Sequence, residues 1–143
     1  NLTGAMLCAR EVLRDMVPRR SGNIINISSM AGRGPLPKRS PYVVSKWGMI
    51  GLTHNLAVEY GPHKIRANCI CPGATEGERF ERVLRTFAES RGEPYERALK
   101  RAVGRTPLGR LVTPEEVADS AVFLASDESS GMTGQIIEVA AGA

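Results

Sequence analysis

Hydrophobic residues recur at intervals of three and four along Asn1–Val17, a pattern that predicts an amphipathic helix. The positions of this stripe are Leu2, Met6, Ala9, Leu13 and Met16. A second long helix is expected over Pro41–Tyr60, because Ser40 is a good N-cap, proline suits a first turn, and Gly61 ends the pattern. The apolar face expected for this second helix consists of Val43, Trp47, Ile50 and His54.

Two apolar runs, Asn23–Ser28 and Ile65–Cys71, are nearly continuous rather than alternating in hydrophobicity. Continuous apolar character indicates strands that are buried on both faces of a parallel sheet. A third short strand is expected at Gln135–Val139. Strands that alternate with helices in this way predict an α/β fold with a doubly wound parallel sheet and flanking helices.

The stretch between the second and third strands is the most polar part of the chain. It contains two short helical patterns, at 78–90 and 93–103, and a stronger helix from Thr113 to about Ala125. Thr113, Pro114 and Glu116 have the spacing of a capping box with proline in the first turn. Between Arg79 and Arg110 the chain carries nine basic residues and four acidic ones, an excess that exceeds the net charge of +4 of the whole chain.

Composition narrows the possible classes of protein. The chain of 143 residues is 42% hydrophobic and 24% charged, which is ordinary for one soluble globular domain. No apolar run approaches the ~18 residues of a membrane span, and the basic segment lacks interleaved aromatic residues, so neither membrane nor nucleic acid is expected as a partner. Cys8, Cys69 and Cys71 are interpreted as small core residues in a reducing, cytoplasmic compartment, not as a disulfide framework or a metal site.

Candidate chemistry gathers around Tyr42 and Lys46. Residues four apart lie on the same face of a helix, so the phenol and the ammonium group are expected to point the same way. A neighbouring cation favours the phenolate and lowers the pKa of a phenol from about 10, which suits proton transfer near neutral pH. Ser29 directly follows a buried strand, and open α/β sheets bind ligands at the carboxyl ends of their strands.

Six segments of the chain carry a resemblance to a known family. They are Ile24–Gly32, Tyr42–Gly48, Ile65–Gly73, Pro107–Arg110, Thr113–Ala118 and Thr133–Gln135. In this order and spacing they resemble the classical short-chain dehydrogenase/reductase family, over nearly the whole chain but over only the later part of the family's domain. The resemblance implies the C-terminal part of a Rossmann-like sheet.

The resemblance also implies an activity, namely hydride transfer between NAD or NADP and an alcohol or carbonyl substrate. Tyr42 would exchange the proton, Lys46 would assist it and bind the ribose of the cofactor, and Ser29 would hold the substrate oxygen. Asn1, in the match Asn1-Leu-Thr-Gly4, would hold a water of the proton relay.

Further residues follow from the same resemblance. Pro72 and Gly73 would lie against the nicotinamide. The family's phosphate-binding threonine position is occupied by Gly77, so Thr75 is the candidate substitute. The family's terminal Asp-Gly-Gly is replaced by Ala140-Ala141-Gly142.

The segment at about 74–112 would be the substrate lid. A basic lid would favour an anionic substrate, and the alternative is a pair of solvated amphipathic helices. Family members pair their long helices across a two-fold axis, so a homodimer or homotetramer is expected.

The glycine-rich turn that binds a dinucleotide pyrophosphate is absent from the chain. Residues 1–143 are therefore interpreted as a single partial domain, with the nucleotide-binding first half absent. Two interpretations remain. The chain is the catalytic and lid part of a longer oxidoreductase, which the presence of Ser29, Tyr42 and Lys46 favours, or it is a truncated non-catalytic assembly or binding module.

Overall fold

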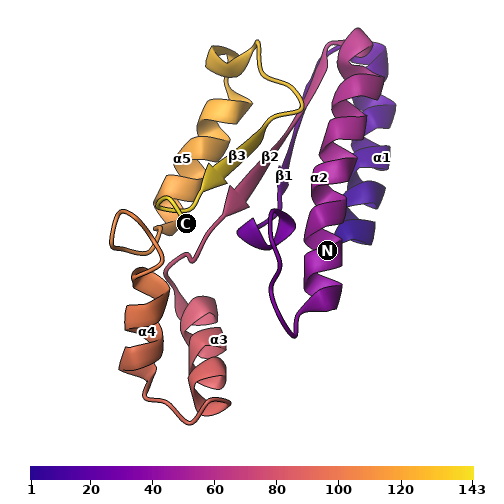
Figure 1. The fold of residues 1–143 in the computed structure, drawn as a ribbon. Coiled ribbons are helices and arrows are strands. Elements are labelled where there is room, and N and C mark those ends of the chain that lie inside the picture. Colours follow the sequence, from indigo (N-terminus) through magenta and orange to yellow (C-terminus); the bar gives the residue numbers. More distant parts are fainter.

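Three parallel strands form the centre of the molecule, which a computed structural model describes over all residues 1–143 (Figure 1). The strands are β1 (Gly22–Ile27), β2 (Ile65–Pro72) and β3 (Ile136–Val139), and their order in the sheet is β1-β2-β3. β2 pairs in parallel with both neighbours. Its central position explains its sequence, because Cys69, Ile70 and Cys71 are all fully buried.

Helices cover both faces of the sheet. Figure 1 shows α1 (Leu2–Arg19) and α2 (Ser40–Tyr60) on one side of the sheet and α5 (Pro114–Ala125) on the other. α3 (Glu78–Glu89) and α4 (Tyr95–Val103) form a separate hairpin beyond the carboxyl ends of the strands. The predicted α/β architecture and order of elements are therefore confirmed.

The main core lies between α1, α2 and the sheet. It contains the buried residues Ala9, Leu13, Leu56, Ala57, Ile65 and Ala67. Gly48 brings the two helices close together, since a Cβ at this position would lie 2.5 Å from the tip of Leu2. This packing fixes the orientation of α2, and with it the side chains that α2 presents to the cavity described below.

The apolar face expected for α2 was wrong. Of its four residues only Ile50 is buried, whereas His54 is exposed and Trp47 is 52% exposed. The residues that α2 buries are Met49, Ile50, Thr53, Leu56 and Ala57. α2 carries apolar residues on two faces, and hydrophobic periodicity alone does not decide which of them meets the sheet.

Two smaller expectations also need correction. α2 begins at Ser40, so Arg39 takes the N-cap position and makes no capping hydrogen bond through its side chain. Cys8 is exposed on α1 rather than buried, because it lies outside the stripe that faces the core; Cys69 and Cys71 are buried as expected. A hydrogen bond with Cys71, together with burial, raises the pKa of the Cys69 thiol.

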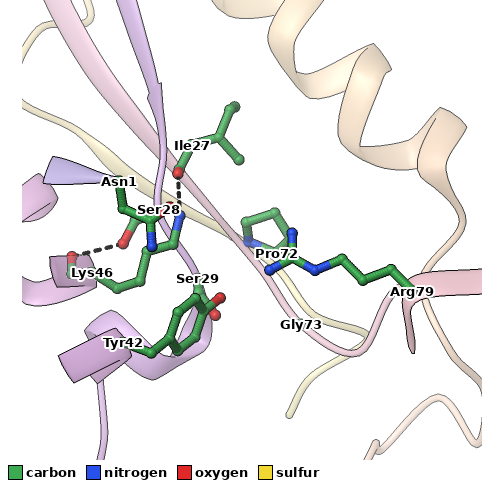
Figure 2. A pocket seen from close by; sticks show the side chains of 9 residues that line it. All are labelled: Asn1, Ile27, Ser28, Ser29, Tyr42, Lys46, Pro72, Gly73 and Arg79. Carbon is green, nitrogen blue, oxygen red and sulfur yellow. Dashed lines mark hydrogen bonds between the residues drawn. The ribbon is translucent and has the colours of Figure 1, made fainter. Parts of the chain in front are cut away.

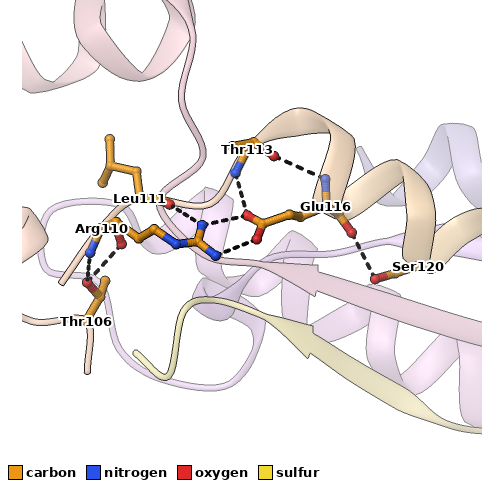
Figure 3. Close-up of polar contacts among 6 residues, drawn as sticks. All are labelled: Thr106, Arg110, Leu111, Thr113, Glu116 and Ser120. Carbon is orange, nitrogen blue, oxygen red and sulfur yellow. Dashed lines mark hydrogen bonds and ion pairs between the residues drawn. The ribbon is translucent and has the colours of Figure 1, made fainter. Parts of the chain in front are cut away.

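The start of α5 has the predicted capping box. The Thr113 hydroxyl accepts a hydrogen bond from the Glu116 amide at 3.2 Å, and the Glu116 carboxylate accepts one from the Thr113 amide at 2.9 Å. Arg110 adds two hydrogen bonds to the same carboxylate, at 2.9 and 2.6 Å (Figure 3). These contacts lower the pKa of Glu116 to about 2, chiefly through the hydrogen bonds from Arg110. The contacts join the end of the lid segment to α5.

β1 is an edge strand with an apolar, open side. The Ser28 amide donates to the Ile70 carbonyl of β2 at 2.7 Å, so the polar backbone groups of the preceding residue, Ile27, point away from β2. The Ile27 side chain is 42% exposed. β1 therefore presents an exposed edge of the sheet. None of the helices combines the length and the apolar character that crossing a bilayer requires.

Candidate active site

A cavity of about 220 Å³ opens at the carboxyl ends of β1 and β2 (Figure 2). Its walls are formed by Asn1, Ile27, Ser28, Ser29, Tyr42, Lys46, Pro72, Gly73 and Arg79. Every site residue predicted from the sequence lines this cavity except Thr75. The sequence therefore identified most of the residues that tertiary folding brings together.

Tyr42 and Lys46 enter the cavity from the first turns of α2. They lie one turn apart on the helix, and the Lys46 ammonium is 5.8 Å from the centre of the Tyr42 ring. Both side chains are half-buried. The expected placement of a cation beside the phenol is therefore present in the fold.

The Lys46 ammonium also donates a hydrogen bond to the Ile27 carbonyl at 2.8 Å (Figure 2). This carbonyl belongs to the open edge of β1, where no neighbouring strand satisfies it. The hydrogen bond holds the ammonium at the mouth of the cavity.

The two serines after β1 have different surroundings. Ser28 is 4% exposed, and its hydroxyl donates to the Lys46 carbonyl at 2.8 Å, which ties the end of β1 to α2. Ser29 is half-buried, and its hydroxyl oxygen accepts a hydrogen bond from the Ala31 amide at 3.1 Å. That contact caps a short 3₁₀ turn, η1 (Met30–Gly32), and leaves the hydroxyl hydrogen of Ser29 free to donate into the cavity.

Gly32 allows η1 to pack directly on α2. A Cβ at this position would lie 2.7 Å from the Ser28 hydroxyl oxygen and 2.8 Å from the Lys46 carbonyl oxygen. Neither oxygen belongs to a long, flexible side chain that could move aside. The absence of a side chain at Gly32 is therefore needed for the Ser28–Lys46 contact.

Asn1 lies beside the first turn of α2. Its side-chain amide is 3.3 Å from the Ser45 hydroxyl, which in turn donates to the Tyr42 carbonyl at 2.7 Å. Asn1 lines the same cavity as Lys46.

Pro72 and Gly73 form the wall contributed by β2. The Gly73 amide donates to the Val139 carbonyl at 2.9 Å, and a Cβ on Gly73 would lie 2.8 Å from the Cα of Ala140. Glycine is thus required where the chain leaves β2 against the end of β3.

Thr75 is the one predicted site residue that does not line the cavity. Its hydroxyl donates to the Gly73 carbonyl at 3.2 Å, and its backbone pairs with Val112. The pairing with Val112 joins the beginning and the end of the lid segment.

Arg79 lines the cavity but was not predicted as a site residue. It lies in the first turn of α3, and the sequence pattern indicated only that it is one of the nine basic residues of the lid. Helical periodicity could not have singled it out, because its place depends on where the start of α3 lies relative to the end of β2.

A parallel sheet between helices, with a cavity at the carboxyl ends of its strands, is the arrangement of a Rossmann-like fold. The family model described as Enoyl-(Acyl carrier protein) reductase matches residues 1–143. The chain belongs to the short-chain dehydrogenase/reductase family.

Individual relatives agree with this assignment. The chain is 39% identical to the 3-oxoacyl-(acyl-carrier-protein) reductase FabG of Thermotoga maritima, over 99% of this chain and 53% of that protein. It superposes on an actinorhodin polyketide ketoreductase solved with NADPH with a TM-score of 0.93 and 32% identity, over 99% of this chain and 55% of the other. An NAD⁺-bound xylitol dehydrogenase matches with a TM-score of 0.93 and 31% identity, over 99% and 56% of the two chains. The chain thus spans about half the length of the curated relatives it matches.

Proposed function

We propose that the protein, in its natural length, is an oxidoreductase that transfers a hydride between NAD or NADP and an alcohol or carbonyl substrate. The observation that carries this proposal is the meeting of Ser29, Tyr42 and Lys46 in one cavity at the carboxyl edge of the sheet. Residues 1–143 would form the catalytic and lid part of one domain. The relatives support the cofactor class, since one was solved with NADPH and another with NAD⁺.

The cavity walls fit the nicotinamide end of such a cofactor. Gly73 leaves no side chain between β2 and the cavity, and Pro72 offers a flat apolar surface beside it. Tyr42 and Lys46 supply a hydroxyl and an ammonium group that suit the hydroxyls of a ribose. When bound, the cofactor supplies or accepts the hydride.

The chain's own residues would handle the proton and the substrate oxygen. Tyr42 would give its phenol proton to the developing alkoxide, or take a proton from an alcohol in the reverse direction. Lys46, 5.8 Å from the ring, would stabilise the phenolate electrostatically. Ser29 would donate a hydrogen bond to the substrate oxygen, and Asn1 would hold a water that returns the proton to solvent.

Replacement of Tyr42 by Phe tests this assignment. The substitution removes one hydroxyl from a half-buried ring, so the fold should persist, while kcat should fall by about 10²- to 10⁴-fold. Tyr60→Phe is the matched control, because Tyr60 is on the same helix and does not line the cavity. Turnover of Tyr42→Phe near that of the control would refute the proposed role.

The alternative function is a non-catalytic assembly or binding module. It would share the fold of the oxidoreductases but would not bind a nicotinamide dinucleotide. Titration of the protein in its natural length with NADH and NADPH separates the two functions. Binding of neither nucleotide would support the module.

We also propose a homodimer or homotetramer in a cytoplasmic, reducing compartment. α1 and α2 expose apolar residues on the face turned away from the sheet, among them Trp47 at 52% and Val58 at 78% exposure. Such a face is suited to pairing with a second copy. Light scattering that gives a monomer would contradict this proposal.

The substrate is proposed to be anionic. Between Arg79 and Arg110 the lid segment carries nine basic residues against four acidic ones, and a cleft with walls of one sign concentrates ligands of the other sign. Binding of the substrate should therefore weaken as ionic strength rises. Affinity that does not change with salt would indicate that the lid's charges are merely solvated.

A further inference from the structure

Arg79 brings a positive charge from the lid into the catalytic cavity. It stands in the first turn of α3, outside the sheet, yet it lines the same cavity as Ser29, Tyr42 and Lys46. Figure 2 shows its side chain extended from α3 toward Pro72, on the side of the cavity opposite α2.

The charge of Arg79 is not paired within the chain, in contrast to that of several other arginines of the lid. Arg82, Arg97 and Arg105 are likewise unpaired, but none of them lines the cavity. Arg101 forms an ion pair with Glu93, and Arg110 forms one with Glu116. Arg85 and Arg91 stack on the rings of Tyr95 and Phe87, at 4.3 and 4.2 Å from the ring centres. The side chain of Arg79 forms none of the ion pairs or cation–π contacts of the structure.

The charged side chains that line the cavity are therefore all positive. The lining contains two cationic side chains, Lys46 and Arg79, and no carboxylate. The Lys46 ammonium already donates to the Ile27 carbonyl, whereas the guanidinium of Arg79, an exposed residue that lines the cavity, makes no hydrogen bond within the chain. A guanidinium presents its N–H donors in a planar fork that matches a carboxylate or phosphate.

We infer that Arg79 determines substrate specificity by binding a carboxylate or phosphate group of the substrate while Ser29 and Tyr42 hold the reacting oxygen. The inference rests on the proposed function. It adds which residue binds the anionic substrate and which chemical group of the substrate is bound. Because Arg79, Ser29 and Tyr42 line one cavity, the anionic group and the reacting carbon would lie close together in one compact compound. Short oxo acids and hydroxy acids, or their phosphate counterparts, satisfy this description.

The test compares short oxo acids with their uncharged methyl esters. The probes are pyruvate, acetoacetate and levulinate with the matching esters, assayed with NADH and NADPH on the protein in its natural length. Arg79→Met retains most of the side-chain volume and removes the charge. The control is Arg82→Met, one turn further along α3 and outside the cavity lining.

The expected result is a selective loss of oxo-acid reduction. Loss of a charge-assisted hydrogen bond should raise KM for the preferred acid and lower kcat/KM by about 10- to 100-fold in Arg79→Met. The esters and the cofactor KM should change little. Arg79→Lys should recover only part of the loss, because an ammonium lacks the bidentate fork.

Several outcomes would overturn the inference. Equal preference of the wild type for acids and esters would do so. A rise in cofactor KM in Arg79→Met, equal with acids and esters, would assign the guanidinium to a cofactor phosphate instead.

If the wild type turns over none of the probes, calorimetric binding of the same compounds tests whether Arg79 binds an anionic group. Binding of the acids that is lost in Arg79→Met supports the anion site while refuting the proposed reaction on these substrates. Binding of neither acids nor esters overturns the anion site as well.

Discussion

Replacement of Gly32 by Ala adds only one methyl group but should clearly destabilise the protein. Gly32 lies where η1 meets α2, and the added Cβ would stand 2.7 Å from the Ser28 hydroxyl oxygen and 2.8 Å from the Lys46 carbonyl oxygen. Contacts this short force either η1 or the start of α2 to move. The same movement would stretch the 2.8 Å hydrogen bond from Ser28 to Lys46.

The magnitude follows from two costs. Overpacking at a well-packed contact costs about 1–3 kcal/mol. Loss of the buried Ser28 hydrogen bond adds about 1 kcal/mol. The free energy of unfolding should therefore fall by about 2–4 kcal/mol, with a decrease in Tm of about 5–15 °C for a domain of this size or somewhat larger.

Urea denaturation and calorimetry of the protein in its natural length measure the loss, and Gly34→Ala is the control. Gly34 belongs to the same loop, and a Cβ there meets no atom within 4 Å. Because the displaced segment carries Lys46, Gly32→Ala should also lower kcat/KM, whereas the control should retain it. If Gly32→Ala and Gly34→Ala had the same free energy of unfolding, η1 would not pack on α2 as described.

Two further substitutions, at Ala141 and Gly142, test backbone conformation after β3. Ala141 has a left-handed backbone with φ 52°, so Ala141→Gly should raise the free energy of unfolding by up to about 1 kcal/mol in urea denaturation. Gly142→Ala should lower it, since φ is 85° and the new Cβ would lie 2.8 Å from Pro107; equal stability of the two variants would contradict this.

The pKa of Glu116 is lowered from 4.5 to about 2 in the folded protein, so its carboxylate stabilises the fold above pH 4.5, and that contribution disappears as pH falls toward 2. Glu116→Gln should therefore flatten the fall in Tm over this pH range, and a fall as steep as that of the wild type would contradict the role of the Arg110 contact.

The contact between Lys46 and the edge of β1 occupies a backbone carbonyl that could otherwise pair with another strand. The Ile27 carbonyl points to the side of β1 that lacks a neighbouring strand, and the Lys46 ammonium satisfies it. A further strand pairing with this edge would compete for the same carbonyl. Lys46 would then be free to turn toward a bound ligand, which is consistent with the role proposed for it.

Much of the site could be predicted because it depends on short-range geometry. Tyr42 and Lys46 lie one turn apart on a helix, and Ser29 is the second residue after β1. Their approach requires only that strand and helix pack in the usual α/β manner. Arg79 could not be predicted, since nothing in its local sequence distinguishes it from the other arginines of the lid.

The sequence by itself determined the order of helices and strands, the parallel sheet and the capping box of α5. These features depend on periodicity and on hydrogen bonds between residues a few positions apart, both of which can be read from a linear chain. Only the tertiary structure decided that α2 buries Met49 and Leu56 while exposing Trp47, and that Arg79, not Thr75, reaches the cavity. Those outcomes depend on contacts between distant segments, where alternative faces of similar apolar content compete and only the packing of the whole molecule selects one.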